Sequence, residues 1–189
     1  MSAAAARAGT GDEVVPGLPR RFQTGRLDLR PLGDADRPLY VSLYTDANVM
    51  RHVGAPLSVE AASRAFEAVR RQMHRDPPKA WYWTACLRGP GREAGVLALA
   101  FDPGRGSAEF GMLLLPWAQG QGHATEAVAA LVAHAFAGVA ASGAGSRIGR
   151  LRTRHASGHP AGPRVMEKLG FVAGPARDGM QHWYLDGPG

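Results

Sequence analysis

Hydrophobic and polar positions change their period several times along this chain, and the changes predict alternating strands and helices. Residues 22–32 alternate well enough for a first strand, and Asp34 can cap a helix that runs to about Tyr44. Ser58 then opens a second helix, because apolar residues recur after it at spacings of three and four. Its apolar face comprises Val59, Ala62, Phe66, Val69 and Met73. This face predicts an amphipathic helix that packs against a sheet.

Three apolar runs follow, separated by short turns that contain glycine and proline. They span residues 80–88, 94–101 and 107–115. Short loops favour an antiparallel meander. The elements expected after it are a long amphipathic helix, a glycine- and serine-rich loop (138–146), a strand (147–155), a helix (about 163–169) and two strands (near 171–176 and 180–185). The pattern predicts one mixed α/β domain over residues 21–189.

The first 20 residues contain alanines but no continuous core of leucine or valine. We therefore expect a flexible leader over residues 1–20 and no signal peptide. No run approaches the roughly 18 apolar residues that a membrane span needs. The single cysteine, Cys86, excludes an internal disulfide framework and favours the reducing cytoplasm.

The segment 116–127, which reads PWAQGQGHATEA, joins the apolar run 107–115 to the long helix. Backbone N–H groups at the positive end of a helix dipole form an anion site, and phosphate is the usual anion. Gly120 and Gly122 allow a close approach of the backbone because they carry no Cβ. The segment therefore predicts a phosphate-binding loop.

Two other interpretations of this turn compete with a phosphate site. One is a turn without a ligand. The other is a dinucleotide-binding loop, which requires a third glycine after G-x-G and an acidic residue about twenty positions later. His123, Ala124 and Thr125 follow Gly122, so the third glycine is missing.

The net charge of +6 comes mostly from arginine. It indicates either a nucleic-acid or ribosome surface or a site for a multiply anionic cofactor. The sequence has no zinc-ligand pattern, nucleic-acid-binding aromatic motif or lysine-rich tail, so we do not expect nucleic acid as the main partner. His123, His155 and His159 fall in separate loops without a zinc spacing, and no metal is expected.

Three segments resemble the GCN5-related N-acetyltransferase (GNAT) superfamily. Gln119, Gly122 and Ala124 fit its Q/R-x-x-G-x-G/A pyrophosphate loop, and RVMEKLGF (164–171) is similar to a late segment of the branch that acetylates ribosomal-protein N-termini. TGRLDLRPL (24–32) is similar to the first strand of that branch. The resemblance covers residues 22–186 and implies a mostly antiparallel sheet of six to seven strands flanked by about four helices.

The resemblance also implies an activity, transfer of an acetyl group from acetyl-CoA to an amine on a protein N-terminus or a small molecule. The resemblance is also compatible with a homodimer. The implied cofactor contacts are Met112, Leu113 and Leu114 along the pantetheine arm, Gln119, Gly120, Gln121, Gly122, His123, Ala124 and Thr125 around the pyrophosphate, and His159 and Arg164 later in the chain. Arg150, Arg152 and Arg154 alternate along one strand. They would receive the cofactor's 3′-phosphate or an acidic acceptor, or form a solvated face.

Acetyl transfer needs a base, because a primary amine has a pKa of about 10 and is protonated at neutral pH. The resemblance places Glu109 at a position that often holds such a glutamate; an ion pair or an exposed edge carboxylate is the competing interpretation. Gly111 is a candidate for a bulge in the same strand.

Three positions depart from the family pattern. His159 stands where many relatives have an asparagine that contacts the cofactor, and a histidine can replace that contact. Gly162 cannot supply the hydroxyl that a serine provides at this position in relatives. Met166 stands where some relatives have a tyrosine that acts as the general acid. A non-catalytic acyl-CoA-binding or regulatory module is therefore the alternative function.

Overall fold

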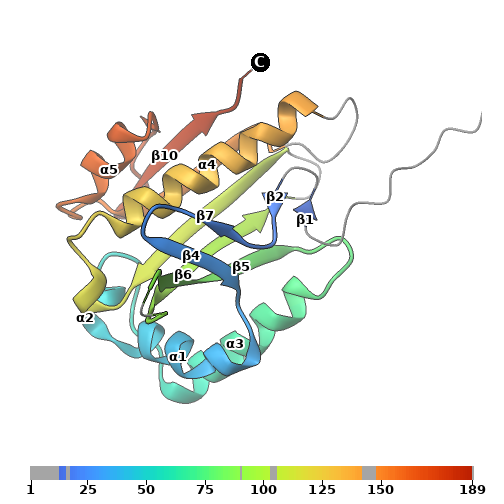
Figure 1. Ribbon diagram of the computed structural model, residues 1–189. Helices are drawn as coiled ribbons and strands as arrows, with labels where there is room; N and C mark the ends of the chain where they lie inside the picture. Colours follow the sequence, from blue (N-terminus) through green and yellow to red (C-terminus); the bar gives the residue numbers. More distant parts are fainter. Residues whose placement is uncertain (1–12, 16–17, 90, 103–105, 142–147, 189) are drawn as a thin grey trace, which may run out of the picture.

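The computed structural model describes residues 13–15, 18–89, 91–102, 106–141 and 148–188 (Figure 1). Its strands are β1 (Glu13–Val15), β2 (Leu18–Pro19), β3 (Phe22–Gln23), β4 (Leu27–Pro31), β5 (Ala80–Leu87), β6 (Glu93–Phe101), β7 (Ser107–Leu114), β8 (Arg150–Ala156), β9 (Val172–Ala173) and β10 (Met180–Asp186). The α-helices are α1 (Arg37–Thr45), α2 (Ala47–Met50), α3 (Val59–Met73), α4 (His123–Ala141) and α5 (Gly162–Lys168), with 3₁₀ turns at Asp34–Asp36 and Pro116–Ala118.

Eight strands form one sheet in the order β3-β4-β5-β6-β7-β8-β10-β9, and β1 and β2 form a separate hairpin. All neighbours in the large sheet are antiparallel except β7 and β8, which run parallel. This confirms the mostly antiparallel α/β fold. Two strands of two residues at the edges, β3 and β9, bring the count above the expected six to seven.

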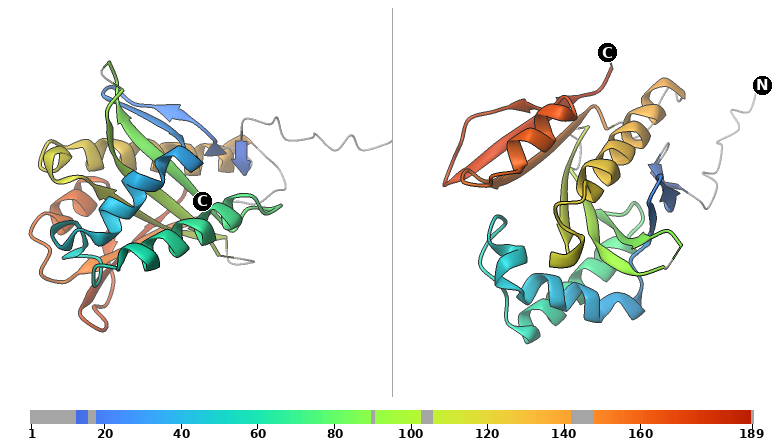
Figure 2. Two further views of the ribbon diagram at one scale, coloured as in Figure 1. Left: turned by 90° about the horizontal axis from the view of Figure 1, so that it is seen from below. Right: turned by 60° about the vertical axis from the view of Figure 1, so that its left-hand side comes forward.

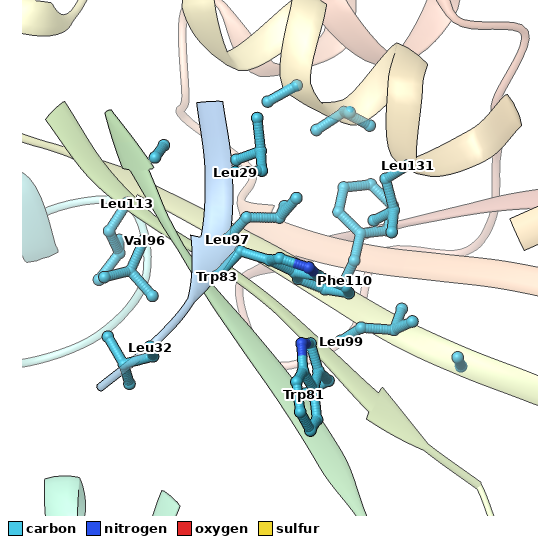
Figure 3. Packing of buried hydrophobic residues seen from close by; sticks show 14 of the residues in the cluster. Leu29, Leu32, Trp81, Trp83, Val96, Leu97, Leu99, Phe110, Leu113 and Leu131 are labelled. Atoms are coloured by element: carbon cyan, nitrogen blue, oxygen red, sulfur yellow. The ribbon is translucent and has the colours of Figure 1, made fainter. Parts of the chain in front are cut away.

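Helices cover both faces of the sheet (Figures 1 and 2). The face of Trp83, Leu97 and Phe110 carries α4 and α5, and the Phe110 ring lies 5.4 Å from that of Phe171 just after α5. The opposite face carries α1 and α3, and Val96 lies opposite Leu113 on it (Figure 3). One hydrophobic cluster includes side chains from both faces.

The parallel pair β7–β8 is short, and this shortness shapes the functional site. Among the residues that the structure describes, three rungs join the two strands: Ser107, Ala108 and Glu109 of β7 lie opposite Arg150, Leu151 and Arg152 of β8. Beyond Glu109 the two strands have no registered pair in the described chain, although β7 continues to Leu114. We call the region between the rest of β7 and the rest of β8 the split. Its closed end is the last pair, Glu109 with Arg152, and its open end is at Leu114, where β7 ends.

The predicted elements agree with the structure in order, and the structure differs locally at two places. The expected strand 22–32 is a hairpin, because the backbone turns between Gln23 and Leu27. The short helix α2 was not anticipated. It begins at Asp46, whose carboxylate accepts hydrogen bonds from the backbone N–H groups of Asn48 and Val49.

Capping was predicted correctly at one helix and incorrectly at another. Ser58 caps α3, accepting a hydrogen bond from the Ala61 N–H at 3.1 Å. Asp34 does not cap α1. Asp36, which is fully buried, accepts instead from the Gly33 N–H at 2.7 Å.

Part of the expected leader belongs to the folded domain, which corrects the boundary at residue 20. Leu18 is 1% exposed in the core, and the Trp83 indole donates to the backbone oxygen of Arg20 at 2.9 Å. Residues 1–12 and most of the predicted loop 138–146 lie outside the described residues; α4 extends to Ala141. No helix in the described chain has the length and apolar character required to cross a bilayer.

Candidate cofactor-binding site

The loop between β7 and α4 has the backbone geometry that its glycines predict. Gly120 has φ of 71° and Gly122 has φ of 81°, a region that is strained for residues with a Cβ. The 3₁₀ turn Pro116–Ala118 leads into this loop, and α4 begins at His123. The two glycines therefore let the chain turn sharply into the helix.

The backbone N–H groups of residues 120–125 have no hydrogen-bond acceptor within the described parts of the chain. The N–H groups at the start of a helix lack intrahelical partners, and the helix dipole gives that end a partial positive charge. Six consecutive donors at the first turn of a 19-residue helix form a site for an anion with several oxygens.

Side chains of the same loop turn back to hold it in place. The Gln119 amide donates to the Leu114 oxygen at 2.9 Å, and the Gln121 amide donates to the Trp117 oxygen at 2.6 Å. The His123 ring is buried, with Nδ1 3.1 Å from the Ala118 oxygen. These contacts engage the polar side chains of the loop, so its backbone N–H groups are the donors that it presents to solvent or to a ligand. Ala124 packs beside Leu114 and Ala118, and Thr125 is half-buried.

Arg26, in the β3–β4 turn, is a cation at this loop that the sequence analysis did not single out. Its Nη1 donates to the Gln121 oxygen at 2.8 Å, and its Nε donates to Glu126 in the first turn of α4 at 2.6 Å. Glu126 also accepts from the Thr24 hydroxyl and the Arg26 N–H. Arg26 lies within the segment TGRLDLRPL, which the sequence analysis used to predict a strand. A strand pattern does not indicate that its arginine contacts a glutamate one hundred residues later in the chain.

The split exposes alternate backbone groups of β7. Leu115 N–H donates to the Ala94 oxygen of β6 at 2.8 Å, so residues 111 and 113 also direct their backbone groups to β6. Met112 and Leu114 direct theirs away from β6, toward the split. Of the three predicted contacts on β7, Leu113 is therefore committed to the sheet, and Met112 and Leu114 face the position of an added strand.

Gly111 does not mark a bulge, because the β6–β7 register runs unbroken from Gly95–Leu114 to Phe101–Ala108. The irregularity lies between β5 and β6, where the register shifts next to Ala94. A Cβ on Gly95 would lie 2.1 Å from the Leu113 oxygen, so glycine is required at position 95. At Gly111, in contrast, a Cβ would meet no atom within 4 Å.

His159 lies in the loop after β8, in a group of three histidines. Its ring stacks on His52 with 4.2 Å between centroids and lies 5.2 Å from the His155 ring. Burial and the two neighbouring rings lower the pKa of His159 to about 4, so it is neutral at pH 7. Nδ1 accepts from the N–H groups of Ala161 and Gly162, which leaves the proton on Nε2. The neutral ring can therefore donate one hydrogen bond, as an asparagine amide does.

The glycine at position 162 follows from the histidine at position 155. A Cβ on Gly162 would lie 2.4 Å from His155 Nε2, so a serine does not fit beside this ring. His155 Nε2 accepts from the Trp183 indole at 2.9 Å, and Nδ1 lies 2.9 Å from the Ala156 oxygen. The departure from the family pattern at position 162 thus has a packing reason: the His155 ring occupies the space that a serine side chain would need.

On α5, Arg164 is exposed, and Met166 is 7% exposed in the core. The Met166 side chain therefore packs and supplies no acid. Among the described residues, no group of three or more histidine, cysteine, aspartate or glutamate side chains is arranged to hold a metal ion.

Glu109 lies at the closed end of the split, on the last paired rung of β7 and β8. One carboxylate oxygen accepts from Arg152 Nε at 3.2 Å, and the other lies 3.5 Å from Arg154 Nε. Its side chain is 35% exposed. Glu109 is therefore ion-paired and still accessible to solvent.

Comparison with known proteins agrees with this geometry. Residues 26–172 match the family model described as an acetyltransferase (GNAT) domain. The structure is similar to an acetyltransferase from Agrobacterium tumefaciens str. C58, with 22% identity, coverage of 87% of this chain and 93% of the other, and a TM-score of 0.72. No curated protein sequence gives a match.

Two further solved structures have informative ligands. RimL, a ribosomal L7/L12 α-N-protein acetyltransferase in complex with coenzyme A, is 18% identical over 88% of this chain and 98% of its own, with a TM-score of 0.70. A spermidine N-acetyltransferase from Vibrio cholerae, in complex with CoA and spermine, is 18% identical over 85% of this chain and 95% of its own, with a TM-score of 0.70. Since the family model spans most of the sequence, the chain belongs to the GNAT acetyltransferase family.

Proposed function

We propose that this protein transfers an acetyl group from acetyl-CoA to a primary amine, by direct attack of the amine in a ternary complex in the cytoplasm. The observation that carries the proposal is the loop 120–125 at the start of α4, beside a sheet that splits along β7. The backbone donors of this loop have no acceptor among the residues that the structure describes. Together these features supply an anion site and an open strand edge, the two elements that a long acyl carrier with a pyrophosphate requires.

The residues present fit acetyl-CoA. The loop backbone would hold the pyrophosphate, with Arg26 adding positive charge and fixing the loop to α4. Met112 would bind the pantetheine arm through its backbone groups and Leu114 through its N–H, because the Leu114 oxygen accepts from the Gln119 amide; His159 would donate from Nε2. When bound, acetyl-CoA supplies an activated acyl group as a thioester. Arg164, which is exposed on α5, would be a further cofactor contact, as the family resemblance implies.

Glu109 is the side chain that we propose accepts the proton of the amine, directly or through a water. It lies at the closed end of the split, where an amine that enters from solvent would arrive, and its carboxylate is accessible. A backbone N–H of β7 that faces the split would stabilise negative charge on the acyl oxygen. The chain's own contribution is thus orientation, proton removal and charge stabilisation.

The test is calorimetric titration with acetyl-CoA, followed by acetylation assays on peptide and small-molecule amines. We expect saturable one-to-one binding, and Glu109→Gln should lower kcat by about a hundredfold while leaving the Kd for acetyl-CoA unchanged. Glu67→Gln, which removes a surface carboxylate paired with Arg37, is the matched control and should change neither.

Two outcomes would contradict the proposal. Absence of binding at millimolar acetyl-CoA would leave only a shared fold. Tight binding with no transfer to any amine would favour a non-catalytic acyl-CoA-binding module.

A further inference from the structure

A polar groove crosses β7, β8 and β10 on the face of the sheet that carries α1 and α3. One hollow, of about 180 Å³, is lined by Glu109, Arg152, Thr153, Arg154, His182 and Tyr184. A second hollow, of about 750 Å³, shares Arg152 and Tyr184 with it and extends to Arg150 and Asp186. The groove begins at the closed end of the split, so it adjoins the position proposed for transfer.

The split is accessible from this face and covered on the other. On the covered face, Phe110 packs on Phe171, and both side chains are buried. On the groove face, Gly111 is exposed in the middle of β7. Its partner on β6, Ala98, is half-buried, and Ala100, the partner of Glu109, is exposed. An acceptor amine therefore reaches the split across Gly111, with the rest of the acceptor over the groove.

Charges in the groove are unevenly satisfied. Asp186 is bonded to Arg150 at 2.5 and 3.0 Å, and Asp102 is bonded to Arg152 at 2.8 Å. Glu109 is engaged by Arg152 and Arg154. Each acid among these lining and neighbouring residues thus has an arginine partner.

Arg154 is the least satisfied of the three arginines. Within the described chain its ion pairing is one 3.5 Å contact to Glu109, and its side chain is 55% exposed. It lies two residues beyond Arg152 along β8, about 7 Å closer to the open end of the split. Because a guanidinium has five N–H donors and the contact to Glu109 uses one of them at 3.5 Å, Arg154 can bind a second anion beside the transfer position.

We propose that the acceptor carries a carboxylate close to its reactive amine, and that Arg154 binds this carboxylate. The inference rests on the proposed acetyltransferase function and specifies its substrate class. An acidic residue near a peptide N-terminus and a free acidic amino acid share this chemistry. A polyamine does not, because it would require acids in the groove that are not already paired.

The position of Arg154 also separates it from the cofactor phosphates. The phosphate loop follows the far end of β7, after Leu114, while Arg154 contacts Glu109 at the closed end of the split. Five residues of extended strand between Glu109 and Leu114 span about 17 Å, so Arg154, about 7 Å from the closed end, lies about 10 Å from the end of β7 at which the loop begins. A role in binding the cofactor's 3′-phosphate is therefore disfavoured.

The experiment measures kcat/KM at saturating acetyl-CoA for matched acceptors. One set is a peptide with Glu, Gln or Lys after the N-terminal residue, the second is free glutamate and glutamine, and the third is spermidine. The readout is the ratio of kcat/KM for the Glu and Gln acceptors, since any general effect on the base cancels in it. We expect a ratio of about ten in the natural protein, which corresponds to one well-formed charge pair.

Variants of two neighbouring arginines test the assignment. Arg154→Gln should bring the ratio close to one, and Arg154→Glu should invert it in favour of the Lys peptide, a change that a merely structural role would not produce. Arg150→Gln is the matched control and should keep the ratio, because Arg150 is paired with Asp186 away from the split. Gly111→Val should lower kcat/KM for every acceptor and leave the Kd for acetyl-CoA unchanged.

Each result supports or overturns the inference. Preference for the peptide or the free amino acid identifies the source of the carboxylate. Turnover with a ratio of one or less, turnover of spermidine above the acidic acceptors, or a ratio that survives in Arg154→Gln overturns this inference and leaves the acetyltransferase function intact. Binding of acetyl-CoA without turnover of any acceptor overturns both.

Discussion

The two ends of the split differ in the chemical groups that they present, which are backbone N–H groups at one end and side chains at the other. At the open end, the loop after β7 presents backbone N–H groups, and its side chains Gln119, Gln121 and His123 hold the loop itself. At the closed end, the backbone is paired, and the groove consists of side chains on β7, β8 and β10. A backbone site binds any ligand with the right shape and charge, while a side-chain groove can be changed residue by residue.

This difference separates two parts of the proposed function. A cofactor that is common to a family suits a backbone site, because two glycines and a helix start are enough to specify it. An acceptor that differs between relatives suits a side-chain groove. The comparison therefore predicts that substitutions at the open end alter acetyl-CoA binding and those at the closed end alter acceptor choice.

The largest expected effect is at the open end, with Gly122→Val. A β-branched residue at φ of 81° is strained, and its Cβ would lie 3.3 Å from Arg26 Nη2. We expect the Kd for acetyl-CoA to rise about a hundredfold by calorimetry, or about 2.7 kcal/mol. Gly89→Val, at φ of 86° in the β5–β6 turn, is the control for strain alone and should leave the Kd unchanged.

The next largest effect is on stability, at positions 155 and 162, where the histidine ring occupies the space of a side chain at position 162. Gly162→Ser should lower the free energy of unfolding by about 2 kcal/mol, because the new side chain overlaps the His155 ring. His155→Ala makes room for it, so the double variant should lose less stability than the sum of the two single variants in urea unfolding. If the stability losses of the two single variants simply add in the double variant, the proposed overlap between the two positions is contradicted.

A smaller effect is expected at Arg26, which links the loop to α4. Arg26→Ala should weaken acetyl-CoA binding about tenfold, because the guanidinium contacts both Gln121 and Glu126. Arg21→Ala removes an exposed arginine that pairs with Asp28 and does not contact the loop, so it should leave affinity unchanged. Equal losses in the two variants would show a general effect of charge.

The smallest effect is a pH dependence at His159. Its folded pKa of about 4 lies below the unfolded value near 6.5, so the neutral form is favoured in the folded state. The associated stability is complete above pH 6.5 and is lost as the pH falls toward 4. Because the ring is partly exposed, we expect a loss of about 1 kcal/mol, well below the full value of the shift.

Urea unfolding at pH 7 and pH 5 measures this loss. His159→Asn, which has the residue of many relatives, should flatten that part of the profile. His134, whose pKa is lowered by burial, should titrate alike in both proteins. A variant profile that matches the natural one would place the pH dependence elsewhere.

Local features were predictable from the sequence because they depend on neighbours along the chain. The meander β5–β7, the Ser58 cap and the positive φ at Gly120 and Gly122 all follow from spacing and turn chemistry. The turn in the first strand and the short helix α2 were missed, since two- to four-residue elements carry almost no periodic signal. Leu18 was assigned to a leader because nothing nearby in the sequence indicates that it is buried.

The sequence alone determined the family, the order of elements and the glycine turn before α4, since each rests on contiguous residues whose backbone geometry is local. Only the tertiary structure decided that Arg26 reaches Glu126, that His155 occupies the space of a side chain at position 162, and that Arg154 shares Glu109 with Arg152. These contacts join residues from 7 to 100 positions apart and depend on strand register. Register is set by the packing of the whole sheet, so no local pattern specifies which side chains meet in the groove.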